Sequence, residues 1–401
     1  MQAELLSPCG SLESLRAALR FGADAVYMGG PVLQMRSASA GFDLEKLASA
    51  IALVHEQGKK AYITVNTLLK NSETGLLRDY GQALLAMGAD GAIVSDLGAL
   101  RILGREVPGL PLHISTQCSV MNHEAAMVYY DMGARRLVLA REMTLEDIGE
   151  MHARLPRDLE LEAFVHGAMC MAYSGRCLIS SFILDRSGNR GQCAQPCRWE
   201  YAEHKKLEVE ERKRPGQIFT IEEEKDYSMV LSSRDLCMVE HLQALHDAGV
   251  VSFKIEGRMK SDYYCAAVTN TYRMAMEGAD LSLCRRELDM VSHRPYTTGF
   301  YYGELPDGHF NSGLYEQDWT FCATVESWEG GVATLIQRNH VALGDELYPL
   351  TPGQVGLHFP LTAMEDEEGQ PLTAAPHPLM RFRIPCPIPL RPGDFLRRPS
   401  R

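Results

Sequence analysis

A repeated unit recurs through the first two thirds of the chain: an amphipathic helix ends at a glycine and a short β-branched run follows. It appears as FGADAVYMG from Phe21, MGADGAIVSD from Met87, MGARRLVLARE from Met132 and AGVVSFKIEGR from Ala248. Glycine after a helix supplies the left-handed conformation that ends it. The runs that follow are apolar on both faces, as in parallel strands covered by helices. The repeat therefore predicts alternating strands and helices and a parallel sheet.

Counting these runs predicts about eight strands, at 3–7, 24–29, 61–66, 91–95, 111–116, 136–141, 160–166 and 251–256. Eight such units have the size of a (β/α)₈ TIM-like barrel. An open doubly wound sheet is the alternative, and it normally carries a glycine-rich phosphate loop after its first strand. Here SPCGSLES follows that strand, which is typical of a capped helix start, so the barrel is favoured.

Two segments interrupt the pattern. The Cys-rich insertion at 168–226 contains the charged stretch HKKLEVEERKRPGQ, which predicts a solvated hairpin or a flexible excursion. After about Tyr296 helical periodicity stops, and Glu329-Gly330-Gly331 predicts a hairpin turn within TFCATVESWEGGVATLIQ. We therefore expect a catalytic barrel domain over 1–292 and a small all-β domain over 293–401.

Charge and hydropathy restrict the classes of partner. The chain carries 40 Lys+Arg against 52 Asp+Glu, a net charge of −12, so any nucleic acid must bind to a local basic patch. No stretch approaches the roughly 18 apolar residues of a membrane helix, and MQAELLSPCG does not resemble a secretory signal. We expect a cytoplasmic protein with reduced thiols; the oligomeric state is not predicted.

Cysteines cluster within the insertion and after it. Of eleven in the chain, five lie close together in sequence: Cys170, Cys177, Cys193, Cys197 and Cys237. A cluster of thiolates in a reducing compartment suits a soft metal site. The gap between Cys170 and Cys177 fits zinc knuckles poorly, whereas an iron–sulfur cluster tolerates irregular spacing. Iron–sulfur is favoured, with zinc or no metal as alternatives.

Polar residues end the predicted strands, where a barrel carries its chemistry. They are Ser7, Asn66, Ser95, Asp96, Ser115, Thr116, Gln117, Arg141, Glu142, His166, Lys254, Glu256 and Arg258. Alternation along VSFKIEGRMK places Lys254, Glu256 and Arg258 on one side of their strand. Such charges must pair with one another or meet a charged ligand. A small dicarboxylate is the natural ligand for Lys254 and Arg258, and an internal salt-bridge chain is the alternative.

Motifs of known hydrolases are absent. No HExxH, G-x-S-x-G or P-loop pattern occurs. A cysteine nucleophile with a spatially adjacent histidine remains possible, with Cys118 near His113 or Cys170 near His166. Each of these thiols is better interpreted as a buried side chain or a metal ligand.

Several long motifs resemble those of the collagenase-like peptidase family U32. They are ELLSPCGSLESLRAALRFGADAVYMGG at 4–30, EAFVHGAMC at 162–170 with Gly175, Arg176, Cys177 and Ser180, GQCAQPCRWEY at 191–201, SSRDLC at 232–237 and FKIEGRMKS at 253–261. HRPYTTGFYYG at 293–303 and the β region after it are similar to the family's C-terminal extension. The resemblance covers nearly the whole chain.

Better-understood members of this family are oxygen-independent hydroxylases with a 4Fe–4S cluster. The chain resembles most the branch that hydroxylates a tRNA wobble uridine to 5-hydroxyuridine with prephenate. This resemblance implies Cys170, Cys177 and Cys193 as cluster ligands, with Cys237 as the fourth and Cys197 as its competitor. Peptide hydrolysis, and hydroxylation of ribosomal RNA or quinone precursors, are the alternative activities; a structural cluster in a non-catalytic protein is a third class.

Two further expectations concern the residues around the site. His166 should lie beside the cluster and either pass a proton or hydrogen-bond a sulfur. A local RNA-binding patch could be formed by Arg135, Arg136, Arg141, Arg176, Arg198, Lys205 and Lys206. Ordinary surface charge is the alternative for that patch.

Overall fold

The computed structural model describes residues 2–35, 42–170, 172–174, 176–177, 180–181, 194, 207–210, 218–221, 234–303 and 315–400. Eight parallel strands form a closed barrel, because the last strand pairs with both the first and the seventh. These strands are β1 (Glu4–Cys9), β2 (Ala25–Gly29), β3 (Lys60–Val65), β4 (Gly91–Val94), β5 (Leu112–Ile114), β6 (Ala134–Val138), β7 (Glu160–Ala168) and β11 (Val250–Ile255). The predicted barrel is confirmed, and the open sheet is excluded.

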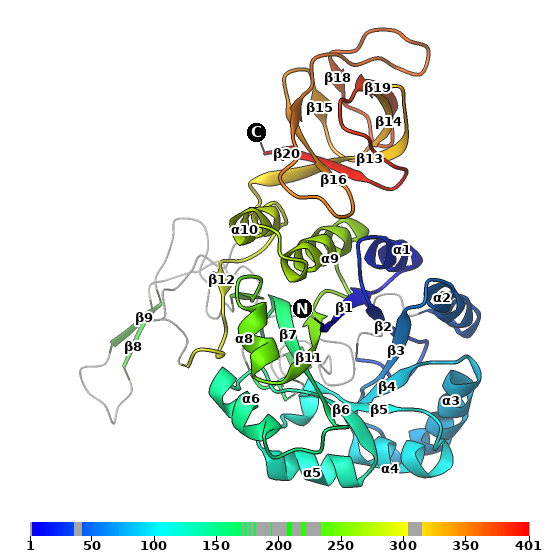
Figure 1. The fold of residues 1–401 in the computed structure, drawn as a ribbon, viewed down its shortest axis with the longest axis vertical. Coiled ribbons are helices and arrows are strands. Elements are labelled where there is room, and N and C mark those ends of the chain that lie inside the picture. The colour runs from blue at the N-terminus through cyan, green and yellow to red at the C-terminus, as the bar shows by residue number, and fades with distance from the viewer. Residues whose placement is uncertain are drawn as a thin grey trace.

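Helices surround the barrel (Figure 1). They are α1 (Leu12–Arg20), α2 (Leu44–Glu56), α3 (Thr74–Ala86), α4 (Leu97–Glu106), α5 (His123–Asp131), α6 (Leu145–His152), α8 (Leu242–Asp247) and α9 (Asp262–Met276), with α10 (Leu281–Asp289) after them. Ser11 caps α1 by accepting a hydrogen bond from the Ser14 amide. Gly22 and Gly249 follow helices with φ of 101° each, so the sequence repeat reflects the left-handed helix ends that it predicts.

The segment after β7 extends the sheet beyond the barrel. β10 (Asp235–Cys237) pairs antiparallel with the end of β7, and β12 (Tyr296–Thr297) pairs with β10. The Tyr301 hydroxyl donates to the Phe164 carbonyl oxygen at 2.7 Å. Residues 293–303, expected in the C-terminal domain, therefore pack against the barrel. Within the insertion, β8 (Leu207–Glu210) and β9 (Ile218–Ile221) form the antiparallel hairpin that the charged stretch predicts.

An all-β module follows the barrel domain. Its sheet has the order β17-β16-β20-β13-β14-β19, formed by β13 (Trp319–Glu329), β14 (Val332–Gln337), β16 (Glu346–Leu350), β17 (Phe359–Pro360), β19 (Arg381–Pro385) and β20 (Phe395–Pro399). β15 (Val341–Ala342) pairs with β18 (Ala374–Ala375). Gly330 and Gly331 have φ of 56° and 88°, as a tight hairpin requires. The module has its own apolar core around Leu335 and Phe382.

The module packs on the outer face of α1, α9 and α10 (Figure 1). Tyr263 of α9 stacks on Phe321 with ring centroids 4.9 Å apart. Arg397 of β20 forms an ion pair with Glu287 of α10, and both side chains are almost fully buried. Arg20 at the end of α1 pairs with Asp394 at 2.6 Å. This interface lies outside the barrel interior, so the module leaves the barrel's own cavity to the strands and their loops.

Across the described ranges, no helix combines the length and the apolar character that crossing a bilayer requires.

Candidate active site

A cavity opens at the carboxyl ends of the barrel strands, where the sequence places the chemistry. Its lining comes from β2, β3, β4, β6, β7 and β11 and from the segments that follow β2, β3, β5, β6, β7 and β11. The lining residues are Tyr27, Met35, Thr64, Asn66, Ile93, Ser115, Thr116, Gln117, Val138, Arg141, Phe164, Cys170, Ser174, Lys254, Glu256 and Arg258. Three of them are cations and one is a carboxylate, so the cavity favours an anionic small molecule.

Several predicted strand-end residues do meet here, and others do not. Asn66 and Gln117 are joined by a hydrogen bond of 2.8 Å across the mouth. By contrast, Ser7 faces outward and bonds Thr269 of α9, and Asp96 caps the helix α4 through the Ala99 amide. The strand-end prediction therefore identifies the mouth correctly but includes residues whose role is local structure.

Arg258 is held firmly against one wall. Its Nη1 donates to Gln34 Oε1 at 2.9 Å and to Thr64 Oγ1 at 2.8 Å. Gly29 makes this approach possible, because a Cβ there would lie 1.7 Å from Gln34 Oε1 and 2.7 Å from Arg258 Nη1. The guanidinium therefore has a fixed position before any ligand binds, which reduces the entropy lost on binding.

Lys254 points into the barrel from β11 and forms the lower wall of the cavity. Its Nζ lies 2.7 Å from Glu162 Oε1, and both side chains are buried. Burial lowers the pKa of Lys254 below its ordinary value, while Glu162 opposes that change. Burial raises the pKa of Glu162, but Lys254 and Arg136 outweigh it and lower the pKa. Each side chain favours the charged form of the other, and the ion-pair partner of Lys254 is Glu162 of the neighbouring strand β7. This modifies the predicted salt-bridge chain along β11.

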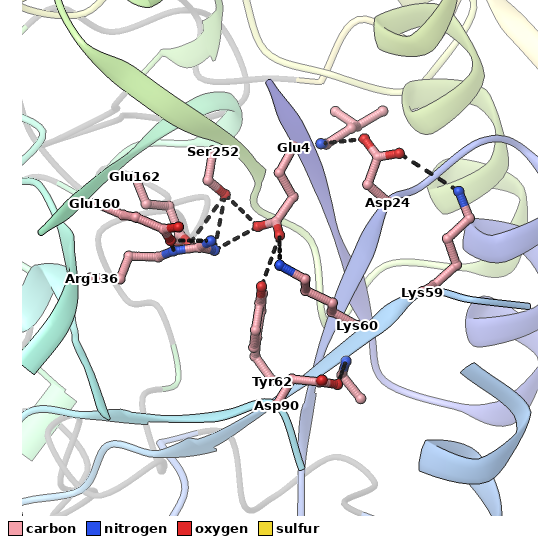
Figure 2. A network of polar contacts seen from close by, with 12 residues as sticks. Glu4, Asp24, Lys59, Lys60, Tyr62, Asp90, Arg136, Glu160, Glu162 and Ser252 are labelled. Atoms are coloured by element: carbon pink, nitrogen blue, oxygen red, sulfur yellow. Dashed lines mark hydrogen bonds and ion pairs between the residues drawn. The ribbon is translucent and has the colours of Figure 1, made fainter. Parts of the chain in front are cut away.

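Below this pair, a network of charges closes the bottom of the barrel (Figure 2). The Nη1 of Arg136 lies 3.1 Å from Glu162 Oε2 and 2.5 Å from Glu4 Oε1, and Nη2 pairs with Glu160 at 2.6 Å. Ser252 donates to Glu4 at 2.9 Å. We call Glu4, Arg136, Glu160, Glu162 and Ser252 the floor network. The prediction of Arg136 as a surface RNA contact is wrong, because its side chain is 3% exposed and points inward from β6.

The sequence reasoning did not identify Glu162 or Gln34 as site residues. Glu162 lies in the predicted seventh strand, and its alternation with Glu160 is the available signal that both face inward. Gln34 has no comparable signal, because it reaches Arg258 from a loop after β2. Both contacts depend on the register between strands that are distant in the sequence.

Glu256 and Tyr27 lie together in the cavity. The Tyr27 hydroxyl donates to the Ile255 carbonyl oxygen at 2.9 Å and lies 3.4 Å from Glu256 Oε2. Burial and the Glu256 carboxylate raise the pKa of Tyr27 well above its ordinary value, whereas Arg258 and Arg141 oppose the rise. Tyr27 is therefore a neutral donor.

His166 lies outside the cavity lining. Its ring packs among Tyr264, Tyr272 and Tyr296, and its Nδ1 is 3.3 Å from the Tyr272 hydroxyl. Burial lowers the pKa of His166 to about 3, so the imidazole is neutral. In the pairing of β7 with β10, His166 lies opposite Cys237. His166 therefore lies next to Cys237, one of the predicted cluster ligands, and does not line the cavity.

The structure describes three of the five predicted ligand cysteines. Cys170 is exposed and lines the cavity, Cys177 is half-buried, and Cys237 is buried with its pKa raised by burial. Cys193 and Cys197 lie outside the described residues. Within the described ranges no three Cys, His, Asp or Glu side chains come together as a metal site. The donor set nevertheless fits a soft metal centre in kind, since all three described thiols are free.

Comparison with known proteins now identifies the family. The model of peptidase family U32 matches residues 10–311, and that of the U32 C-terminal domain matches residues 317–397. The chain belongs to peptidase family U32. The family's two parts correspond to the barrel domain and the β module, so the junction between residues 311 and 317 agrees with the packing of 293–303 on the barrel.

Members of family U32 with quite different names are similar to this chain. The tRNA hydroxylation protein P of Escherichia coli is 34% identical, over 96% of this chain and 94% of that protein. The collagenase of Porphyromonas gingivalis is 33% identical, over 98% of this chain and 97% of that protein. The 23S rRNA 5-hydroxycytidine C2501 synthase of Escherichia coli is 38% identical, over 68% of this chain and 39% of that protein. The family is thus certain, while the relatives' names divide between RNA hydroxylation and proteolysis.

Proposed function

We propose that this chain hydroxylates a uridine of tRNA at C5, with prephenate or a similar dicarboxylate as co-substrate and a 4Fe–4S cluster as cofactor. The observation that carries the proposal is the cationic cavity at the barrel mouth, where Arg258, Lys254 and Arg141 outnumber Glu256. The similarity to tRNA hydroxylation protein P over nearly the full length of both chains supports tRNA as the RNA. The wobble position is the finer assignment that the sequence resemblance implies.

The sequence suggests two cysteine–histidine pairs for a peptidase, Cys118 with His113 and Cys170 with His166. In the described part of the chain no hydrogen bond joins either pair. Cys118 Sγ donates to the Ser95 carbonyl oxygen at 3.3 Å, and burial raises its pKa to about 11. His113 packs against Tyr62 inside the barrel. The ring of His166 packs among three tyrosines. An activated thiol needs a lowered pKa and an adjacent base, so these observations favour hydroxylation over peptide hydrolysis.

The chemistry defines what the cavity must bind. Replacing C5–H by C5–OH inserts one oxygen atom into the bond, and the hydrogen ends on the new hydroxyl. The donor therefore loses one oxygen atom and accepts two electrons. Arg258 and Lys254 would together hold one carboxylate of the donor through charge-assisted hydrogen bonds, and Glu256 and the neutral Tyr27 hydroxyl would orient its polar groups. Ser115, Thr116 and Gln117 offer further neutral partners.

Cys170, Cys177, Cys193 and Cys237 are the proposed holders of the cluster, with Cys197 as the competing fourth ligand. A bound cluster would supply one-electron transfer. Cys170 borders the cavity, so the proposed ligand set adjoins the place where the donor would bind. His166 would support this set from behind Cys237 as a neutral imidazole, in agreement with its depressed pKa.

Deletion of the gene tests the proposed activity directly. We expect 5-hydroxyuridine and the nucleosides derived from it to disappear from digested total tRNA, and re-expression of the wild-type chain to restore them. The host must lack a paralogue that compensates. Unchanged tRNA nucleosides in such a host would refute the tRNA assignment. A change in 5-hydroxycytidine of ribosomal RNA, or in quinone precursors, would transfer the activity to one of the alternatives.

Variants of Arg258 and His166 separate donor binding from cluster support. Arg258→Ala should retain full iron and the visible absorption of the cluster but lose about a hundredfold or more in kcat/KM, as for removal of a charged group that positions the reactant. His166→Ala should instead lose iron, because it removes the side chain behind Cys237. Arg258→Lys keeps the charge without the fork geometry and should fall between Arg258→Ala and the wild type. Wild-type activity in Arg258→Ala and His166→Ala would contradict both assignments.

A further inference from the structure

Arg141 lies across the mouth from Arg258. It follows β6, whereas the guanidinium of Arg258 contacts Thr64 and the loop after β2. In the strand order of the closed barrel, two strands lie between β6 and β3, which carries Thr64, and three lie between β6 and β2. Both arginines line the same cavity. Both charges also lower the pKa of Tyr27, against the larger effects of burial and Glu256, so they act on the same part of the cavity from different walls.

The guanidinium of Arg141 is fixed by neutral groups. Nη1 donates to the Ala168 carbonyl oxygen at 2.7 Å, and Cζ lies 3.9 Å from the centroid of the Phe164 ring. These contacts stabilise the position of the side chain without neutralising its charge. Arg141 therefore presents a preorganised cation, of the kind that recognises a carboxylate with little loss of entropy.

The charge of Arg141 has no matching carboxylate among the described residues. Lys254 is paired with Glu162, and Arg136 with three glutamates of the floor network. No such ion pair with a described residue exists for Arg141, and its Nε is buried without a hydrogen-bond partner. A buried donor left unpaired is unfavourable. An anion that pairs with this guanidinium would relieve the imbalance.

We propose that Arg141 is a second carboxylate-binding residue, which makes the cavity selective for a dicarboxylate that reaches from Arg258 to the β6 wall. This inference rests on the proposed function, since it names the co-substrate class of the same site. Glu256, the one carboxylate among the described lining residues, lies beside Tyr27 and disfavours additional negative charge near that side. The second acid group of the ligand is therefore directed towards Arg141.

Binding measurements with a matched pair of ligands test this role without any turnover. Prephenate carries two carboxylates, whereas phenylpyruvate is aromatic and lacks both the ring carboxylate and the ring hydroxyl, so each variant is compared with the wild type for one ligand at a time. Calorimetry would compare both ligands with anaerobically purified full-length protein of measured iron content. We expect Arg141→Gln to weaken prephenate binding about tenfold or more, as for loss of one charge-assisted hydrogen bond. Phenylpyruvate binding should change less than about threefold in the same variant, since its single carboxylate stays with Arg258.

Two further variants make the result specific. Arg154→Gln removes an exposed arginine after α6, outside the cavity, and should bind prephenate like the wild type. Arg141→Lys retains the charge and should lose less affinity than Arg141→Gln, which also covers the case in which Arg141→Gln folds poorly. Equal prephenate affinity in the wild type, Arg141→Gln and Arg141→Lys would overturn the inference while leaving the proposed activity standing. A different result would separate the two proposals. If the wild-type protein binds neither ligand, while deletion of its gene still removes 5-hydroxyuridine from tRNA, the inference and the dicarboxylate co-substrate are both wrong. The tRNA assignment would then still hold.

Discussion

Glu162→Ala is expected to destabilise the barrel by about 3–5 kcal/mol, the usual cost of breaking a buried ion pair by removing one partner. The Glu162 side chain is 0% exposed and lies between Lys254 and Arg136. Without its carboxylate, Lys254 keeps no ion-pair partner among the described residues, and Arg136 loses one of three. Urea unfolding followed by the helical circular dichroism signal measures the change, because the helices of the described chain belong to the barrel domain.

Glu160→Ala is the matched control for this experiment. It removes a carboxylate from the same strand and the same Arg136 partner, but the Glu160 side chain is 47% exposed. Exposed ion pairs contribute only about 0–1 kcal/mol. If Glu162→Ala costs no more than Glu160→Ala, the floor network does not stabilise the barrel as we infer.

Glu162→Gln adds a functional readout. The carboxylate of Glu162 favours the protonated form of Lys254, so its neutral replacement lowers the pKa of Lys254 further. If activity depends on the charge of Lys254, its decline at alkaline pH should begin at lower pH in Glu162→Gln than in the wild type. A pH profile with an unmoved alkaline limb would show that Lys254 does not need its charge for the reaction.

Arg397→Met is expected to have a similarly large effect on the junction between barrel and β module. It leaves Glu287 buried, at 3% exposure, without its cation, which costs about 3–5 kcal/mol. Glu287 also accepts a hydrogen bond from the Gly356 amide at 2.8 Å, so it cannot leave the interface without losing a second contact. Limited proteolysis between the two parts, together with calorimetric unfolding, measures the loosening.

An exposed pair in the same module serves as the control. Arg381 pairs with Glu326 at 2.7 Å with both side chains substantially exposed, so Arg381→Met should change stability by about 0–1 kcal/mol. Replacing both buried partners, in Glu287→Leu with Arg397→Met, should recover much of the loss because no unpaired charge remains. If the double variant is no more stable than Arg397→Met, the unpaired charge of Glu287 does not account for the loss of stability.

The eight barrel strands could be predicted from the sequence because their signal is local. An amphipathic helix, a glycine at its end and an apolar run follow one another again and again along the chain. The charged side chains of the interior could not be placed in the same way. Arg135 and Arg136 are adjacent, yet strand alternation exposes the first and buries the second, and the sequence does not fix which is which. The partners of Lys254 and Arg258 come from strands and loops far away in the chain, so their contacts require the closed barrel and its register.

The cysteines show the opposite case. The motifs that contain these cysteines resemble those of the family closely, because the motifs are long and specific. Their convergence, however, depends on the insertion between β7 and β10, where Cys193 and Cys197 lie outside the described residues. The ligand assignment therefore rests on the resemblance to the family, whereas the described residues give positions only for Cys170, Cys177 and Cys237.

The floor network also closes one end of the barrel. Leu6, Tyr62 and Ile93 fill the barrel interior above the charges of Glu4 and Arg136, so the described residues leave no passage from the amino-terminal side to the cavity. An RNA whose uridine reaches into the mouth would cover the entrance that the described residues leave to the proposed co-substrate site. We therefore expect the proposed reaction to be sequentially ordered, with the proposed dicarboxylate binding first and its product released only after the RNA has left. Excess RNA would then inhibit turnover by trapping the unloaded protein.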